Sequence, residues 1–395
     1  MMKRIFSAAA VLALLLTLLQ IALGPARVSA LAPESSADIA ARLQPFVDSH
    51  TLAGAVTLVA GKDKVLSLEA VGYADVAAKK PMQTDCLFWI ASMSKPITAT
   101  ALMMLVDEGT VCVDDPVEKY LPEFKGQQVA VKRDDGQVVL QKPKHPILVR
   151  NVLSHTSGLP FSSPKEHPTL DVLPLSEAVV SYAKLPLQFE PDSKYQYSNA
   201  GINTAGRIIE VVSGMPYEEF LAKRLFIPLG MKDTSFRPNK EQLQRLAKSY
   251  RPNADKTGLE ETRIGQLKYP LDDCRRQPMP AGGLFSTATD LSLFCRMILG
   301  SGVFEGKRYL SEASLRQMTS TQTGDLPAAY GFGWGTDRRP GGPFGHGGAY
   351  ATNMQIDPQR QLIVIFMVQH AGWPNASGNQ IFPTFQQAAV KAFAK

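Results

Sequence analysis

The chain has 395 residues, of which 45% are hydrophobic and 20% are charged. This length and composition suffice for a large buried core and exclude a disordered protein. The formal net charge is +6, and it falls to +3 if the first thirty residues are removed, because they contain three basic residues and no acidic one. The sequence has no run of Lys and Arg and no basic stripe interleaved with aromatic residues, so nucleic-acid binding is not expected.

The first thirty residues have the pattern of an export signal. Lys3 and Arg4 precede an almost unbroken apolar stretch from Ala8 to Leu23, and Val28-Ser29-Ala30 has small residues at the positions that signal peptidases read. We expect residues 1–30 to be a cleaved signal peptide and the mature protein to be periplasmic or secreted. An uncleaved membrane anchor is the alternative, since the segment from Ile5 to Leu23 is nearly long enough to span a bilayer. No later apolar run reaches that length.

Four cysteines are present, and none belongs to a CxxC pair, so neither a zinc site nor a redox-active dithiol is expected. They are Cys86, Cys112, Cys274 and Cys295. An exported protein can form a disulfide, but the spacing assigns no pair, and small buried thiols explain these residues equally well. No metal ion or organic cofactor is expected.

The clearest patterns of the first two thirds of the chain are one hairpin and two helices. Gly54 to Asp75 reads as two β-branched-rich strands around a Gly-Lys-Asp turn. After Ser92 the apolar spacing predicts a helix that ends at Gly109. From Val113 to Pro280 short helical patterns alternate with Pro-rich loops, and Ala200 to Gly214 is the clearest helix among them.

Strand patterns return near the C-terminus, over residues 329–336, 344–358 and 361–370, before a final helical pattern at 383–394. Strands at both ends with helices between them predict an α+β fold, in which one antiparallel sheet is built from the two ends of the chain. We expect a discontinuous sheet domain over residues 31–112 and 281–395, with a mostly helical domain over 113–280 inserted in it.

The first candidate for chemistry is Ser92-Met93-Ser94-Lys95. A serine hydroxyl becomes a strong nucleophile when a base removes its proton, and Lys95 lies one helical turn after Ser92 on the same face. The lysine must be neutral to act as that base, which burial or nearby positive charge can achieve. The apolar sequence on both sides of Ser92 favours such burial, although an ordinary serine near a helix start gives the same pattern.

Two more copies of Ser-x-x-Lys occur in the chain. Ser162 and Lys165 lie in a Pro-rich loop, and Ser181 and Lys184 lie at the expected exposed end of a short helix. We expect all four side chains to be solvated, so Ser92 is the preferred nucleophile.

The second candidate is Tyr197-Ser198-Asn199, the only Tyr-x-Asn in the chain. A tyrosine oxygen can share a proton with Ser92 and Lys95, and the Asn199 amide can hydrogen-bond both the lysine and a substrate. A buried tyrosine followed by a helix-capping asparagine is the simpler alternative.

The third candidate is His346, within the glycine-rich stretch from Phe344 to Tyr350. Glycines allow a ligand to approach a strand edge closely, and the backbone N–H of Ala349 could point into such a site. A single histidine is more often structural than catalytic, so this signal is weak when taken alone.

Taken in order, the three motifs resemble those of the serine β-lactamase and penicillin-binding-protein-like family, and specifically its class C branch. That family has Ser-x-x-Lys, Tyr-x-Asn and Lys/His-x-Gly on a strand of the sheet. The likeness covers essentially the whole mature chain and includes the stretches Val149 to Pro160 and Ala281 to Phe294. It implies the β-lactamase/transpeptidase-like fold.

The resemblance also implies roles for the candidate residues. Ser92 is acylated, Lys95 and Tyr197 share the proton transfers, and Asn199 orients them. The backbone N–H groups of Ser92 and Ala349 form the oxyanion hole. Which of the lysine and the tyrosine takes the serine proton is left open.

The third motif has two candidates. A literal Lys256-Thr257-Gly258 lies in a polar stretch without a strand pattern, inside the expected helical insert. His346-Gly347-Gly348 is followed by two strand patterns and has the C-terminal position that the resemblance requires. The histidine copy is therefore preferred.

This choice bears on the substrate. Family members that bind the carboxylate of β-lactams or D-Ala-D-Ala usually have lysine and threonine where this chain has His346 and Gly347. A neutral imidazole and a missing hydroxyl hold a carboxylate less well, and His-Gly-Gly also occurs in carboxylesterases of the family. We therefore expect hydrolysis of a small ester through an acyl-enzyme on Ser92, without a cofactor.

Two alternatives stay open. The first is an enzyme of the same type with another substrate: a β-lactamase, a D-Ala-D-Ala carboxypeptidase or a D-aminopeptidase. The second is a non-catalytic exported binding protein of the same fold, which holds peptidoglycan or a partner protein. The presence of all three motifs argues against the second, because a site that has lost its activity usually loses its serine or its lysine.

Overall fold

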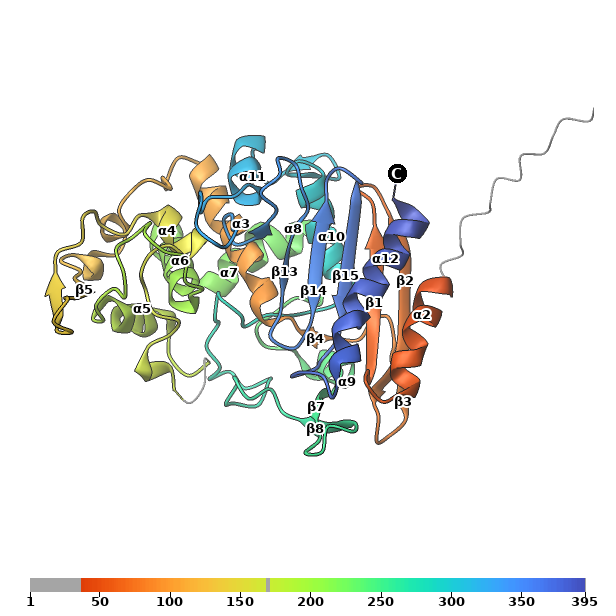
Figure 1. The fold of residues 1–395 in the computed structure, drawn as a ribbon. Helices are drawn as coiled ribbons and strands as arrows, with labels where there is room; N and C mark the ends of the chain where they lie inside the picture. The colour runs from red at the N-terminus through yellow and green to blue at the C-terminus, as the bar shows by residue number, and fades with distance from the viewer. Residues whose placement is uncertain (1–36, 168–170, 395) are drawn as a thin grey trace, which may run out of the picture. The chain divides into compact units, whose positions relative to one another are not determined.

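A seven-stranded antiparallel sheet organises the fold, with the strand order β12-β13-β14-β15-β1-β2-β3. Its N-terminal strands are β1 (Gly54–Ala60), β2 (Val65–Asp75) and β3 (Lys80–Pro81). Its C-terminal strands are β12 (Gly335–Thr336), β13 (Phe344–Gly347), β14 (Asn353–Asp357) and β15 (Leu362–Met367). The pairing of β1 with β15 joins the two ends of the chain in one sheet (Figure 1), which confirms the predicted α+β class.

The computed structural model describes residues 37–167 and 171–394. The predicted export signal lies outside these residues. Within them, no helix combines the length and the apolar character that a membrane crossing requires. The four cysteines are unpaired thiols; Cys86 and Cys295 are buried, and Cys112 and Cys274 are exposed.

Both faces of the sheet are covered by helices. They are α2 (Ala37–Asp48), α3 (Ser94–Asp107), α10 (Ala288–Leu299) and α12 (Ile381–Phe393). Every residue of β1 is buried, and successive side chains point to opposite faces. Ala55 and Val59 pack under α2 and α12, whereas Val56 and Leu58 join the larger core with α3 and α10. The continuous apolar sequence of β1 is therefore explained by helices that cover both faces of this strand.

The middle of the chain is largely helical, and α6 provides its longest helix. Its helices are α4 (Val149–Ser154), α5 (Leu175–Ala183), α6 (Asn199–Ser213), α7 (Tyr217–Leu221), α8 (Ile227–Leu229) and α9 (Lys240–Gln244). Between α10 and the C-terminal strands, the chain forms the short hairpin of β10 (Val303–Phe304) and β11 (Lys307–Arg308) and then the helix α11 (Glu312–Thr319). The domain boundaries proposed above stay predictions.

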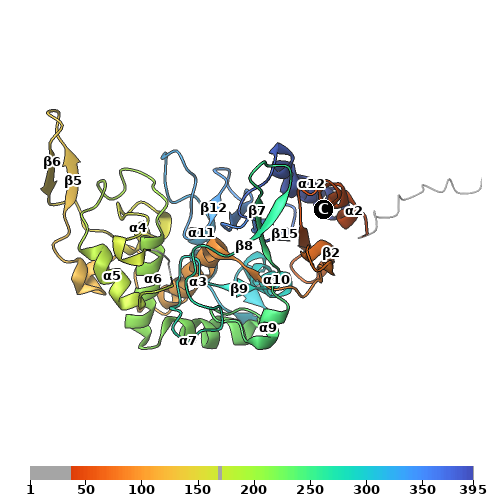
Figure 2. The same cartoon turned by 90° about the horizontal axis from the view of Figure 1, so that it is seen from below.

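The middle region also contains two hairpins that the sequence patterns did not predict. One pairs β5 (Val129–Lys132) with β6 (Val138–Gln141) and projects at the end away from the main sheet (Figures 1 and 2). The other pairs β7 (Ser249–Pro252) with β8 (Leu259–Thr262). The expectation of no strand around Lys256 was wrong, because backbone hydrogen bonds of Tyr250 with Gln369 and Ala371 fix β7 beside the C-terminal segment.

A two-residue antiparallel ladder joins the segment before Ser92 to a distant part of the chain. β4 (Phe88–Trp89) pairs with β9 (Phe285–Ser286), and the N–H of Ile90 donates to the carbonyl of Leu284 at 3.0 Å. The segment just before Ser92 is thereby held beside residues nearly two hundred positions later in the chain.

The strand expected over residues 329–336 forms only at its last two residues. Gly333 explains the difference, because its φ of +77° interrupts an extended strand and its N–H donates to the carbonyl of Leu153. A Cβ atom on Gly333 would lie 2.8 Å from the carbonyl oxygen of Lys95, so only glycine allows this approach to α3.

The doubly covered sheet predicts the effect of a core truncation. Leu58→Ala should lower the free energy of unfolding by about 2–5 kcal/mol, since it leaves a cavity in the larger core. The matched control is Val65→Ala on β2, where the side chain is 38% exposed and the loss should stay within about 0.5 kcal/mol. Urea denaturation followed by far-UV circular dichroism measures both, and equal losses would contradict the assignment of Leu58 to the core.

Candidate active site

Ser92 lies in a single 3₁₀ turn, Ala91–Met93, directly before α3. Ala91 has a φ of +45°, a conformation that residues other than glycine rarely adopt and that is often found at functional sites. Ser92 is half-buried and lines a cavity of about 280 Å³. Its hydroxyl is therefore accessible from a space large enough for a small molecule.

Lys95 is fully buried in the first turn of α3, and its amine contacts three oxygen atoms. The Nζ atom lies 3.0 Å from Ser92 Oγ, 2.8 Å from Asn199 Oδ1 and 2.6 Å from the carbonyl oxygen of Ala281. Burial lowers the pKa of Lys95 well below its ordinary value. The geometry thus joins three distant segments of the chain at one amine.

The three contacts fix the orientation of a neutral amine. A neutral lysine has two N–H donors and one lone pair, and the oxygens of Asn199 and Ala281 can only accept. The two N–H groups are therefore directed at those oxygens. The lone pair is left for the hydroxyl of Ser92, which is the arrangement needed to remove its proton.

Tyr197 lies beside the same amine, with Lys95 Nζ 4.7 Å from the centre of the phenol ring. Burial raises the pKa of Tyr197, and this effect outweighs the hydrogen bond with Ser92 that lowers it. The tyrosine is therefore held as a neutral phenol.

Asn199 is not the helix cap that the simpler alternative required. Ser198 caps α6, since its Oγ accepts from the N–H of Gly201 at 3.0 Å and donates to the carbonyl of Pro160 at 2.6 Å. The Asn199 side chain is thereby free to contact Lys95. Tyr-x-Asn is thus brought to Ser-x-x-Lys as the sequence predicted.

His346 lies on β13 and has a defined tautomer. Its Nδ1 is 2.7 Å from the carbonyl oxygen of Gly347, and its Nε2 is 3.0 Å from the hydroxyl of Tyr330. Because the carbonyl only accepts, Nδ1 carries the proton and Nε2 accepts from Tyr330. Burial is the main cause that lowers the pKa of His346 to about 3. The imidazole is neutral at physiological pH, and it lines a different depression from that of Ser92.

Gly348 allows the third motif to pack closely against the turn that contains Ser92. A Cβ atom at this position would lie 2.6 Å from the carbonyl oxygen of Ile90, two residues before Ser92. The next residue, Ala349, lines the Ser92 cavity, and its N–H makes no hydrogen bond within residues 37–167 and 171–394. This free donor has the position expected for half of an oxyanion hole.

The other Ser-x-x-Lys copies do not form such a site. Ser162 lines the Ser92 cavity, but Lys165 is exposed. The expectation that Ser181 is solvated was wrong: it is buried and hydrogen-bonded to Ser163, because α5 packs against that loop, while Lys184 is exposed. The Lys256-Thr257-Gly258 sequence lies in the turn between β7 and β8, outside the main sheet.

His155 is a site residue that the sequence reasoning missed. It ends α4 with a φ of +62° and is buried. Its carbonyl accepts from the N–H of Gln196 at 2.9 Å, and its Nδ1 accepts from the N–H of Ser198 at 3.1 Å. Its ring packs 4.4 Å from that of Tyr197. Burial lowers the pKa of His155 well below the ordinary range, so Nδ1 stays an acceptor.

The residues after His155 continue this support. The carbonyl of Phe161 accepts from the N–H groups of both Asn199 and Ala200, each at 3.0 Å. Residues 155–161 therefore act as a template that positions Tyr-x-Asn. The sequence signal was the stretch Val149 to Pro160, which resembled the family without giving any residue a role.

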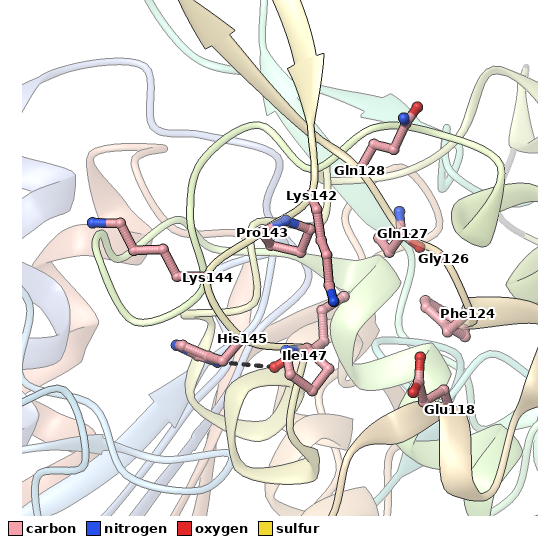
Figure 3. A pocket seen from close by; sticks show the side chains of 11 residues that line it. Glu118, Phe124, Gly126, Gln127, Gln128, Lys142, Pro143, Lys144, His145 and Ile147 are labelled. Atoms are coloured by element: carbon pink, nitrogen blue, oxygen red, sulfur yellow. Dashed lines mark hydrogen bonds between the residues drawn. The ribbon is translucent and has the colours of Figure 1, made fainter.

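A larger cavity, of about 420 Å³, lies elsewhere and contains none of the motif residues. Figure 3 shows its lining, to which Lys142, Lys144 and His145 contribute side chains. The dashed line marks the 2.9 Å contact between His145 Nδ1 and the carbonyl of Pro146. Among the residues that the structure describes, no serine or cysteine lines this cavity, so size alone does not make it the active site.

The supporting role of residues 155–161 predicts losses of kcat of different size for two substitutions of His155. His155→Asn keeps an acceptor near the Nδ1 position and tolerates a positive φ, so kcat for ester hydrolysis should fall less than about threefold. His155→Phe keeps a ring but loses the acceptor, and kcat should fall about tenfold or more. Steady-state kinetics, with thermal melting as the control for folding, separates the two. Equal kcat in both variants would contradict the template.

The comparisons with known proteins agree with this geometry. The family model described as Beta-lactamase matches residues 39–382. Protein Rv1367c of Mycobacterium tuberculosis is 34% identical over 84% of this chain and 89% of its own length. Esterase EstB of Burkholderia gladioli is 33% identical over 51% of this chain and 52% of its own. The D-alanyl-D-alanine-carboxypeptidase/endopeptidase AmpH of Escherichia coli is 27% identical over 84% and 83%.

Among solved structures, EstCE1, described as a hydrolase with promiscuous acyltransferase activity, superposes with a TM-score of 0.73 and 25% identity. The match covers 90% of this chain and 99% of the EstCE1 chain. The fold is thus β-lactamase/transpeptidase-like, as the motifs implied, and the chain belongs to the beta-lactamase family.

Proposed function

We propose that this protein is an exported serine hydrolase that cleaves small uncharged carboxylic esters through an acyl-enzyme on Ser92. The observation that carries the proposal is the buried Lys95 amine, 3.0 Å from Ser92 Oγ and hydrogen-bonded to two oxygens that can only accept. This arrangement gives the serine a base without any cofactor.

In the first half of the reaction, Ser92 Oγ attacks the ester carbonyl carbon while its proton passes to Lys95. The negative charge that develops on the carbonyl oxygen is stabilised by the N–H groups of Ser92 and Ala349. The C–O bond to the alcohol then breaks, and the alkoxide takes the proton from Lys95, directly or through the phenol of Tyr197. In the second half, water gives a proton to the same groups and attacks the acyl carbon. The bond between that carbon and Ser92 Oγ then breaks, Oγ takes the proton back from these groups, and the carboxylic acid leaves.

The electrostatics of the cavity favour an uncharged substrate. The residues that line it within the described ranges include no lysine and no arginine, and Glu166 contributes a buried carboxyl group. His346 is neutral, and Gly347 offers no hydroxyl, so the third motif supplies no cation for a carboxylate. The name of EstB, an esterase, supports this choice. A D-alanyl-D-alanine carboxypeptidase is the second candidate, supported by the likeness to AmpH along most of the chain.

A non-catalytic binding protein of the same fold is disfavoured by the same geometry. Such a protein has no need to bury a lysine beside a serine, because burying an amine costs free energy unless the neutral form is useful. The Lys95 contacts are intact, and Ser92 is accessible from the cavity.

The substrate proposal is tested with Ser92→Ala on two chromogenic compounds. The wild type should hydrolyse p-nitrophenyl butyrate efficiently and a cephalosporin poorly, and the variant should lose at least about a thousandfold of the ester activity. Ser181→Ala is the matched control, since Ser181 is the serine of another Ser-x-x-Lys and lies outside the cavity. A higher kcat/KM for the cephalosporin would reject the ester preference, and full ester activity in Ser92→Ala would reject the nucleophile.

The lowered pKa of Lys95 predicts the pH dependence of acylation. Protonated lysine cannot accept the serine proton, so kcat/KM should fall as the pH drops through the pKa of Lys95. Asn199→Asp places a carboxylate 2.8 Å from the amine and should move this limb to higher pH by about one unit or more, because an anion stabilises the ammonium form. Asn253→Asp on an exposed turn is the control. A limb that does not move in Asn199→Asp would exclude Lys95 as the base.

A further inference from the structure

The carbonyl of Ala281, one of the two acceptors that orient the Lys95 amine, belongs to a loop before β9 and to no helix or strand. The loop makes a turn in which the N–H groups of Gly282 and Gly283 donate to the carbonyl of Met279. This turn uses neither the Ala281 carbonyl nor the peptide unit before it. Other groups must therefore hold that carbonyl 2.6 Å from Lys95 Nζ.

Two buried side chains bind the peptide unit that joins Pro280 to Ala281. Thr98 Oγ1 donates to the carbonyl oxygen of Pro280 at 2.8 Å, and the N–H of Ala281 donates to Asn203 Oδ1 at 3.0 Å. Because a peptide unit is planar, two hydrogen bonds on its opposite edges fix its orientation. On the other side of the Ala281 carbonyl, Trp89 Nε1 donates to the carbonyl of Gly282 at 2.8 Å. The Ala281 carbonyl thus lies between two fixed points of the loop.

Thr98 and Asn203 each lie one helical turn after a residue of the site. Thr98 follows Lys95 by three positions on α3, and Asn203 follows Asn199 by four positions on α6. Residues at these spacings share a face of the helix, and α3 packs against α6. The two helices that bring together the amine and its first acceptor therefore also hold the loop that supplies the second.

The hydroxyl hydrogen of Thr98 is directed at the loop by a tyrosine. The hydroxyl of Tyr217 lies 2.6 Å from Thr98 Oγ1 and has no other hydrogen-bond partner in the part of the chain that the structure describes. It therefore donates to Thr98, whose own hydrogen is left for a carbonyl. The carbonyl oxygen of Pro280, at 2.8 Å, is closer than that of Ser94, at 3.1 Å.

The amide of Asn203 is oriented in a similar way. Its Nδ2 donates to the hydroxyl of Tyr182 at 2.9 Å, and that hydroxyl donates to Glu166 Oε1 at 2.5 Å. Because the phenol has only one hydrogen, which the carboxyl oxygen accepts, it can only accept from Asn203. The amide oxygen of Asn203 is thereby turned toward the N–H of Ala281.

We infer that Thr98 and Asn203 are positioning residues that hold the Ala281 carbonyl on the Lys95 amine and so direct its lone pair at Ser92. This inference rests on the proposed reaction at Ser92 and adds two residues that control the rate of its first step. Neither of them lines the Ser92 cavity, so they act through the loop and not through the substrate.

The test uses diethyl p-nitrophenyl phosphate, which reports on the nucleophile whatever ester the protein prefers. A bond forms between Ser92 Oγ and phosphorus, p-nitrophenolate leaves, and the serine proton passes to Lys95. Thr98→Val and Asn203→Leu should each lower the second-order rate constant about tenfold to a hundredfold, because the amine loses its alignment. Thr98→Ser keeps the hydroxyl and should stay within about threefold of the wild type.

Thr100→Val is the matched control. Thr100 is buried on the same helix as Thr98, but its Oγ1 has no hydrogen-bond partner within residues 37–167 and 171–394. Removal of this hydroxyl should leave the rate constant unchanged. Thermal melting of each variant shows that it is folded at the assay temperature.

The pH dependence separates positioning from a general loss of packing. When the Ala281 carbonyl moves away, the ammonium form of Lys95 loses more stabilisation than the neutral form, so its pKa should fall. The low-pH limb of the rate should therefore move to lower pH in Thr98→Val. A loss of packing alone would lower the rate by the same factor at every pH and leave the limb in place.

The outcomes separate this inference from the proposed function. Wild-type rates in Thr98→Val and Asn203→Leu, an unmoved limb, or equal losses in Thr98→Ser and Thr98→Val would overturn the inference and leave ester hydrolysis intact. If the wild type reacts with the phosphate at Ser92 but hydrolyses no ester, the proposed function fails, and the same variants still decide the role of the two residues. A wild type whose Ser92 does not react with the phosphate would overturn the inference, because no activated serine is then present. If Asn203→Leu does not fold, the comparison of Thr98→Val with Thr98→Ser decides.

Discussion

The buried amine of Lys95 is the constraint on which the site depends. An ammonium group at this position would lose its hydration, so burial lowers the pKa of Lys95 and shifts the equilibrium toward the neutral amine. The neutral form has only two N–H groups, and the oxygens of Asn199 and Ala281 take both. Burial therefore makes the unprotonated amine available, and the two acceptors direct its lone pair toward Ser92.

The fold can be understood as the means of holding that amine. Ala281 reaches it because β4 and β9 pair beside the nucleophile turn, and Asn199 reaches it because residues 155–161 bind the start of α6. Gly333 lets a third segment close over α3. Each contact joins segments that are far apart in the sequence, so the site exists only in the folded chain. The energetic cost of a buried lysine is offset by the packing of the doubly covered sheet.

The sequence was sufficient to predict the strands and helices whose pattern arises from residues close together in the chain. β-Branched residues on both sides of a turn predicted the hairpin of β1 and β2, and helical spacing predicted α3 and α6. The β7–β8 hairpin was missed because its short polar strands depend on contacts with residues 369–371. His155 and Ala281 were missed for a related reason. His155 supports the site through its ring and its backbone, and Ala281 contacts Lys95 through its carbonyl oxygen. Neither role can be inferred from the type of residue.

The most direct test of the central claim is to find the acyl group. Turnover of p-nitrophenyl butyrate is quenched in acid, and the digested protein is mapped by mass spectrometry, in the wild type and in Lys95→Met. The account predicts a butyryl group on the peptide that contains Ser92, on that serine, in the wild type and none above background in the variant. An acyl group on another residue, or equal labelling of Ser92 without Lys95, would contradict it.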